Sequence, residues 1–161
     1  MQTHSRRSLE FDLFDTPPEH RFDRLVNLVR LALNVPVSLI SLVGPDRQFF
    51  KAAAGLQEPW ASLRQTPLSH SFCKHVVHMQ QTLVVEDAFT HPLVKNNPAV
   101  RDLNIGSYLG EPVRRETGQV VGAICAIEGN RRRWRSNEKQ MMRLFASMVE
   151  DELACIPHAA A

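Results

Sequence analysis

The sequence predicts an α+β fold in which a central antiparallel sheet of five or six strands carries helices on both faces. Two observations support this prediction. The segments VSLISLV at residues 37–43 and VVGAICAI at residues 120–127 are apolar on both alternating faces, which is typical of central strands that are covered on both sides. Amphipathic helices near the two ends of the chain are expected to share one face of the sheet.

The first of these helices is predicted to begin in the segment TPPE and to end near Leu33. Thr16 is the expected N-cap, Pro17 suits the first helical position, and Glu19 is placed to complete a capping box. The apolar residues recur at helical spacing and are predicted to face the core: Phe22, Leu25, Val26, Val29 and Leu33. Asn34 and Pro36 end the helix.

The remaining elements alternate between strands, helices and irregular segments. Turn residues 44–46 and 116–118 predict two hairpins, and the second suits Gly118 at a positive φ. We expect strands at 47–53, 82–85, 105–114 and 119–128, a helix at 71–79, a loop at 57–66, and an irregular segment at 87–98.

The last helix is predicted to run from a cap at Ser136 to about Leu153. One stripe of this helix is apolar, and further apolar residues broaden it beyond the needs of a single interface. The stripe consists of Met141, Leu144, Phe145 and Met148, and the broadening residues are Met142, Val149 and Leu153.

Length and composition indicate one domain at residues 16–155, with an N-terminal extension at 1–15 and a C-terminal tail at 156–161. Of the 161 residues, 43% are hydrophobic and 22% are charged, which is ordinary for a globular chain. A net charge of +2 is too small to predict a nucleic-acid partner. No apolar segment is long enough to predict a membrane span or a signal peptide, so we expect a cytoplasmic location with its three cysteines reduced.

Three groups of reactive or charged residues have the chemistry of candidate metal, catalytic or nucleic-acid sites. His70, Cys73, His75 and His78 have the chemistry of zinc ligands, but a helix would turn Cys73 and His75 to nearly opposite sides, so we expect no metal site. Cys73 beside histidines also suggests a thiolate nucleophile, yet a buried apolar role fits it better. The arginines around Trp134, at 131–133 and 135, are expected to form a solvated loop.

The order of these motifs resembles the GAF family, over about residues 9–154. The resemblance rests on FDTPPEHRFDRLVNLVRLALNVPVSLISLVGPDRQFFKAAAGL, SFCKHVV, TLVVEDAFTHPLVKNNPAV and IGSYLGEPVRRETGQVVGAICAIEGNRRRW, followed by the closing helix. It implies a pocket on the side of the sheet away from the terminal helices, in which family members hold small ligands. By position, the implied ligand-binding residues are Phe72, Cys73, Val76, Asp87, Phe89, Leu93, Asn96, Ser107 and Tyr108.

The resemblance does not identify the ligand or any cofactor. The sequence lacks a signature like the Asn-Lys-x-Asp-Glu of cyclic-nucleotide-binding members. Bilin-binding members attach their chromophore through a differently placed cysteine, usually beside a histidine, whereas Cys73 is followed by Lys74. The cysteines also stand in motifs unlike those of the free methionine sulfoxide reductases that share the fold.

We therefore expect a sensory domain of bacterial signal transduction and not an enzyme. It would bind a small molecule, form a homodimer through its terminal helices and act on an output protein in trans. Two alternatives stay open: a ligandless protein-interaction and dimerisation domain, and a thiol-based redox enzyme that uses Cys73 and Cys125.

Overall fold

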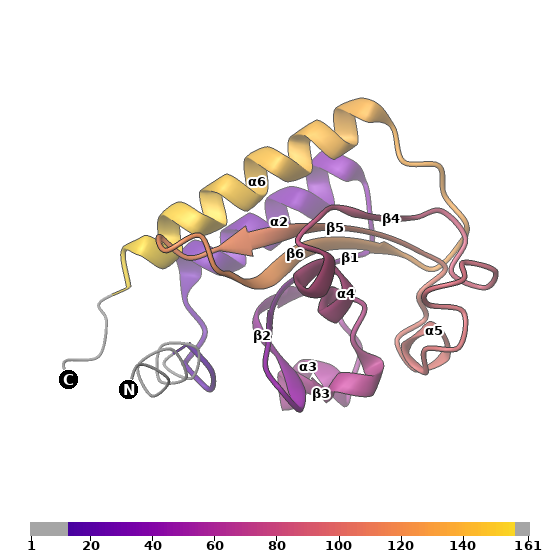
Figure 1. Cartoon of the computed structure of the whole chain (residues 1–161). Coiled ribbons are helices and arrows are strands. Elements are labelled where there is room, and N and C mark those ends of the chain that lie inside the picture. Colours follow the sequence, from indigo (N-terminus) through magenta and orange to yellow (C-terminus); the bar gives the residue numbers. More distant parts are fainter. Residues whose placement is uncertain (1–12, 157–161) are drawn as a thin grey trace.

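The computed structural model describes residues 13–156, so residues 1–12 of the predicted extension and 157–161 of the predicted tail lie outside the described range. Six antiparallel strands form one sheet in the order β3-β2-β1-β6-β5-β4 (Figure 1). Their bounds are β1 Val37–Val43, β2 Arg47–Ala54, β3 Gln65–Pro67, β4 Leu83–Val85, β5 Ser107–Arg114 and β6 Val120–Glu128. The predicted α+β fold class is confirmed.

The two segments predicted to be central are neighbours in the middle of the sheet. β1 pairs with β6 on one side, where Ile40 is opposite Ile124, and with β2 on the other, where Ile40 is opposite Ala52. Glycine at position 122 allows β6 to approach β1 closely, because a Cβ added there would lie 1.9 Å from the carbonyl oxygen of Ser41 on β1. The turn between β5 and β6 places Gly118 at φ 87°, as predicted.

Helices α2 (His20–Leu33) and α6 (Ser136–Ala154) cover one face of the sheet. Figure 1 shows them side by side above the strands. The stripe of α2 predicted to be buried is buried, and it packs with Leu42, Phe49 and Ile124 in one apolar core. Burial of large aliphatic and aromatic side chains of this kind stabilises the fold by about 1.5–3 kcal/mol each.

The predicted N-cap is three residues too early at α2 and one residue too late at α6. α2 begins at His20 with Glu19 as its N-cap, and the Thr16 hydroxyl instead donates a hydrogen bond to the carbonyl oxygen of Leu13 at 2.9 Å. At α6 the N-cap is Arg135, whose backbone N–H donates to Glu138 Oε1 at 2.9 Å, and Ser136 is the first helical residue.

The structure shows which part of the wide apolar arc of α6 faces the sheet. The buried apolar residues are Met142, Ala146, Val149 and Leu153. Leu144 and Met148 of the predicted stripe are 67% and 44% exposed. Helical spacing shows that α6 has two apolar stripes, but it does not say which of them meets the sheet.

The opposite face of the sheet carries three short helices and a 3₁₀ turn. These are α3 Trp60–Leu63, the turn Leu68–His70, α4 Cys73–Met79 and α5 Ala99–Asp102. α3 and most of β3 fall in the segment 57–66 that was predicted to be a loop, so that prediction is wrong for residues 60–63 and 65–66. In the part of the chain that the structure describes, no helix is both long and apolar enough to span a bilayer.

Candidate functional site

The middle of the sheet face beneath α4 is filled by the protein's own side chains. Tyr108 on β5 is 1% exposed, and its ring centroid lies 5.2 Å from that of Phe72. The tyrosine reaches this position by crossing Gly110, where an added Cβ would lie 2.3 Å from the Tyr108 hydroxyl oxygen. A ligand bound at the centre of this face would therefore have to displace Tyr108.

The same centre contains two free cysteines in a polar contact. Cys73 Sγ lies 3.0 Å from the Tyr108 hydroxyl oxygen. The pKa of the Cys73 thiol is lowered, first by the neighbouring Cys125 and then by the Tyr108 hydroxyl. The pKa values of Cys125 and Tyr108 are raised, chiefly by burial. Both thiols are buried.

A cavity of about 110 Å³ lies on this face, at the end of the sheet where β1 begins and β6 ends. Its lining comes mainly from the segment after β2 and from the segment around α5, and it combines apolar with polar groups. The lining residues are Pro36, Val37, Gly55, Leu56, Gln57, Trp60, Asp102, Leu103, Asn104, Ile127 and Gly129. Apolar walls with a few polar groups are typical of small-molecule sites.

The polar side of the cavity is held in place by contacts around Asp102. His70 Nε2 lies 2.8 Å from Asp102 Oδ2, and the His70 ring centroid is 5.4 Å from that of Trp60. The pKa of Asp102 is lowered, first by the hydrogen bond from His70 and then by that from Arg101. The carboxylate at the cavity is therefore ionised and already paired near neutral pH.

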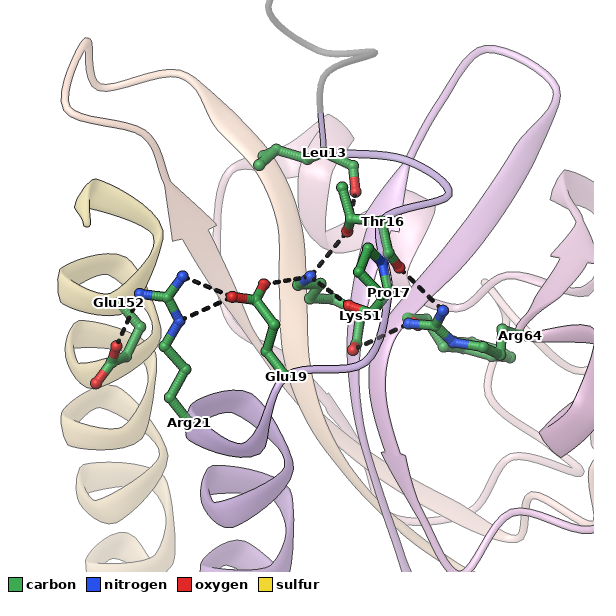
Figure 2. A network of polar contacts seen from close by, with 9 residues as sticks. Leu13, Thr16, Pro17, Glu19, Arg21, Lys51, Arg64 and Glu152 are labelled. Carbon is green, nitrogen blue, oxygen red and sulfur yellow. Dashed lines mark hydrogen bonds and ion pairs between the residues drawn. The ribbon is translucent and has the colours of Figure 1, made fainter. Parts of the chain in front are cut away.

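A polar network joins the sheet to the segment that precedes α2 (Figure 2). Lys51 on β2 is the extra residue of a β-bulge, because the register with β1 passes from Phe50 to Ala52. Its side chain is fully buried, and Nζ lies 2.8 Å from Thr16 Oγ1, 3.0 Å from the Pro17 carbonyl oxygen and 2.6 Å from Glu19 Oε2. All three protons of the ammonium group thus have oxygen acceptors.

The network continues in both directions from Lys51. Arg21 lies between Glu19, at 2.7 Å, and Glu152 of α6, at 3.7 Å. On the other side, Arg64 follows α3 and donates to the Thr16 carbonyl oxygen at 2.9 Å. These contacts link the segment around the cavity to the C-terminal part of α6 (Figure 2).

The outer surfaces of the terminal helices carry exposed apolar side chains. On α2 these are Leu28, at 40% exposure, and Leu31, at 80%, and on α6 they are Leu144 and Met148. We call these four residues the outer face. Apolar side chains that share one helical surface in this way are typical of interaction surfaces.

A model of the GAF domain family matches residues 17–153. The chain belongs to this family. Among solved structures, the GAF domain of Acinetobacter phosphoenolpyruvate-protein phosphotransferase superposes with a TM-score of 0.69 at 19% identity, covering 99% of this chain and 100% of that one. The cyanobacteriochrome receptor PixJ superposes with a TM-score of 0.66 at 18% identity, covering 84% and 93%.

Two curated relatives of this GAF domain are signalling enzymes. The chain is 29% identical over 128 residues to the cyclic di-GMP phosphodiesterase PA2567 of Pseudomonas aeruginosa, which covers 78% of this chain and 21% of that protein. It is 31% identical over 51 residues to the diguanylate cyclase DgcP of Escherichia coli, which covers 32% and 15%. This GAF domain thus spans about a fifth or less of the length of either relative, and it resembles a part of signalling proteins.

The nine ligand-binding residues that the resemblance implied fall into two groups in the structure. Five are buried: Phe72 at the N-cap of α4, Cys73 and Val76 on α4, and Ser107 and Tyr108 at the start of β5. The other four lie between β4 and α5, where Asp87 pairs with Arg131 at 3.1 Å, Phe89 is 52% exposed, Leu93 is 42% exposed and Asn96 is exposed. None of the nine lines the 110 Å³ cavity.

Sequence reasoning did not single out the residues that line this cavity. Trp60 offered one signal, because a large aromatic residue in a segment predicted to be a loop needs a partner. The histidine cluster is dispersed, since His70 pairs with Asp102 while His75 and His78 follow on α4. Within residues 13–156 no group of three or more His, Cys, Asp or Glu side chains could hold a metal ion.

Proposed function

We propose that this GAF domain is a sensory module of bacterial signal transduction, not an enzyme, which binds a small molecule and signals through dimerising terminal helices. The observation that carries the proposal is the cavity between the segment after β2 and the segment around α5. Its volume of about 110 Å³ limits the enclosed part of a ligand to a few heavy atoms, and the signalling relatives support a regulatory role. The output is proposed to be a partner protein acting in trans or a further domain.

The chemistry of the cavity favours a small ligand with one flat apolar part and hydrogen-bonding edges. Trp60 supplies an aromatic surface, and Gln57 and Asn104 supply amide groups that both donate and accept. Because Asp102 is already paired with His70, it can accept a further hydrogen bond without requiring a cationic ligand.

Native mass spectrometry of the purified chain tests ligand binding. A retained small molecule is expected on the wild-type protein and is expected to be lost in Trp60→Ala. Leu63→Ala is the matched control, because Leu63 lies on the same helix, is 55% exposed and does not line the cavity. Retention that is equal in both variants would place the ligand elsewhere.

The proposed signal output is a dimer formed by the outer face. Leu31 and Leu144 are 80% and 67% exposed, although Leu is usually covered when it recurs on a helix surface. Ion pairs through Lys51 and Arg21 connect the segment near the cavity to α6. A ligand that bound more tightly to one of two arrangements of α6 would then shift α6 towards that arrangement.

A ligandless interaction domain is the second candidate. It is favoured by the way that Tyr108 and Phe72 fill the centre of the sheet face. A bare mass in the native spectrum, combined with a dimer in solution, is the result that would select this candidate over ligand sensing.

A thiol-based redox enzyme is the third candidate, favoured by the lowered pKa of Cys73 beside Cys125. The free methionine-R-sulfoxide reductases of Staphylococcus aureus and Thermoplasma acidophilum share the fold, with TM-scores of 0.62 and 0.63. Turnover of free methionine sulfoxide that is lost on Cys73→Ser or Cys125→Ser would support it. Absence of turnover by the reduced wild-type chain would rule it out.

A further inference from the structure

A groove of about 450 Å³ runs beside β2 and shares only Gly55 with the cavity that Trp60 lines. One wall is the polar side of α2, the other wall is α3 with the residue after it, and the floor is β2 itself. The residues that matter here are Asp23 and Arg30 on α2, Ala53 and Ala54 on β2, and Ala61 and Arg64 on the far wall. Small side chains on the floor leave the groove unfilled.

The floor of the groove is a sheet edge without a neighbouring strand in the described part of the chain, where Ala53 is exposed while Ala52 and Ala54 are buried. β3 pairs with β2 only along Arg47–Phe49, and the backbone N–H of Phe50 extends this pairing by one bond to the carbonyl oxygen of Arg64. Beyond that point, the stretch 52–54 pairs with β1 on one side and, among the described residues, has no strand on the other. Unpaired backbone groups at an edge are a template for an added strand.

Arg30 supplies the second, independent feature of the groove. Its Nε is shielded from solvent and has no hydrogen-bond partner in the structure. Within residues 13–156 its guanidinium makes no hydrogen bond or ion pair, whereas Arg64 on the facing wall is bonded to Thr16 and Phe50. Leaving a buried donor without a partner costs about 1–3 kcal/mol, so the position of Arg30 suits an oxyanion that is not part of this fold.

The backbone around Gly55 holds Arg30 at the groove. A Cβ added to Gly55 would lie 3.4 Å from Arg30 Cζ and 1.9 Å from the Pro36 carbonyl oxygen, so the guanidinium lies against a bare backbone turn. Gly55 has φ 79°, which favours glycine at this turn. The absence of a side chain at position 55 thus leaves room for the Arg30 guanidinium at the end of β2.

We propose that this groove binds an extended peptide segment, which adds as a strand to β2 at residues 52–54 and pairs one acidic side chain with Arg30. Strand addition gives affinity through main-chain hydrogen bonds, and side-chain pockets give selectivity. The planar guanidinium matches a carboxylate in a two-bond geometry. Asp23, two turns away on α2, disfavours a second acidic residue at its end of the groove.

Two fluorescein-labelled heptapeptides test the proposal by fluorescence polarisation. They are Thr-Val-Thr-Glu-Thr-Val-Thr and the same sequence with Gln in place of Glu. The wild-type chain is expected to bind the Glu peptide about tenfold more tightly or better, because charge-assisted hydrogen bonds are roughly twice as strong as neutral ones. Equal affinity for the two peptides, or no binding of either, overturns the proposal.

Variants separate the contribution of the Arg30 charge to peptide binding from that of the unpaired edge of β2. Arg30→Gln is expected to bind both peptides equally and weakly, while Ala53→Phe, at an exposed position on the floor, is expected to bind neither. Arg24→Gln removes an exposed arginine of the same helix that does not line the groove, and it is expected to keep the tenfold preference. Loss of the preference in Arg24→Gln as well would mean attraction by general charge and would overturn the assignment to Arg30.

Hydrogen exchange locates the bound peptide. Saturating the wild-type chain with the Glu peptide is expected to slow amide exchange within residues 52–54 at least fivefold, because an added strand protects edge amides. Slowing confined to another element would overturn strand addition at β2. The far-ultraviolet circular dichroism of each variant shows whether it has folded. The polarisation results of the folded variants then show whether Arg30 and the edge of β2 bind the peptide.

Discussion

At the scale of single residues, Gly110 shows how one missing side chain determines what fills the centre of a sheet face. Tyr108 crosses the space that a Cβ at position 110 would occupy, with contacts of 2.3 to 2.6 Å to that Cβ. Gly110→Ala is therefore expected to displace the tyrosine ring and to lower the free energy of unfolding by about 1–3 kcal/mol, the usual cost of overpacking. Urea denaturation measures this change.

A double-mutant cycle identifies the cause. If the clash with Tyr108 is responsible, Gly110→Ala is expected to cost much less in a Tyr108→Leu background, because the leucine side chain ends short of position 110. A cost that is the same in both backgrounds would show that the alanine disturbs the strand itself.

Lys51 carries a buried charge whose desolvation is offset by hydrogen bonds and an ion pair. Its ammonium group is 0% exposed and is bound to Thr16, Pro17 and Glu19. Lys51→Met is expected to lower the free energy of unfolding by about 1.5–3 kcal/mol, since hydrogen bonds to a charged group are lost and their acceptors remain. Lys95→Met is the matched control at an exposed position and is expected to change it by about 0.5 kcal/mol or less.

The same residue explains why the start of α2 was predicted wrongly. Thr16, Pro17 and Glu19 form a good local capping sequence, so short-range rules favour a helix that begins at Pro17. Lys51, 35 positions further along the chain, instead takes the Thr16 hydroxyl as an acceptor. A local pattern contains no information about a partner this distant.

At the scale of elements, the sequence best predicted the strands that are buried on both faces of the sheet. β1 and residues 120–127 of β6 were predicted as central because every position in them is apolar or small, and no exposed strand needs such a pattern. α3 and β3 were missed because they have four and three residues, which is too short for a period to be recognised. The sequence could not show which stripe of α6 meets the sheet, because Met148 on one stripe and Val149 on the other are both apolar.

The second stripe of α6 leads to a prediction about self-association. If the outer face forms a dimer, Leu144→Glu is expected to raise the dimer dissociation constant by about tenfold or more, because a desolvated charge at an interface is costly. Sedimentation velocity over a concentration series measures this.

Arg143→Gln is the control for the change in charge. Like Leu144→Glu it changes the net charge by about one unit, but its side chain lies towards β5 and not on the outer face. A dissociation constant that rises equally in both variants would point to net charge. A wild-type chain that is monomeric at every concentration would contradict the proposed dimer.

At the scale of the whole molecule, the cavity could not be predicted because it forms where distant segments meet. Its lining comes from the start of β1, the segment after β2, the segment around α5 and the end of β6. The family resemblance implied a pocket on the side of the sheet away from the terminal helices, and this cavity lies on that side. The size of Tyr108 and the position of Trp60 then decided which part of that side stays open, and both depend on packing in three dimensions.

The charged contacts together predict how stability depends on pH. The pKa values of Asp15, Glu19 and Asp102 are lowered, first by hydrogen bonds from Arg47, Lys51 and His70 respectively. The pKa of His75 is lowered by burial. In each case the unfolded chain binds the proton more readily, so the free energy of unfolding is expected to fall as the pH falls.

The fall is expected in two steps. The first accompanies protonation of His75 below its ordinary pKa of about 6.5, and the second begins near the ordinary carboxyl values of about 4. Urea denaturation between pH 7.5 and 3 measures both steps. His75→Ala is expected to remove only the upper step, and Lys51→Met is expected to make the lower step shallower, because Glu19 then keeps Arg21 as its remaining cationic partner. A free energy of unfolding that rises on acidification would contradict the ion pairs on which the network around Lys51 rests.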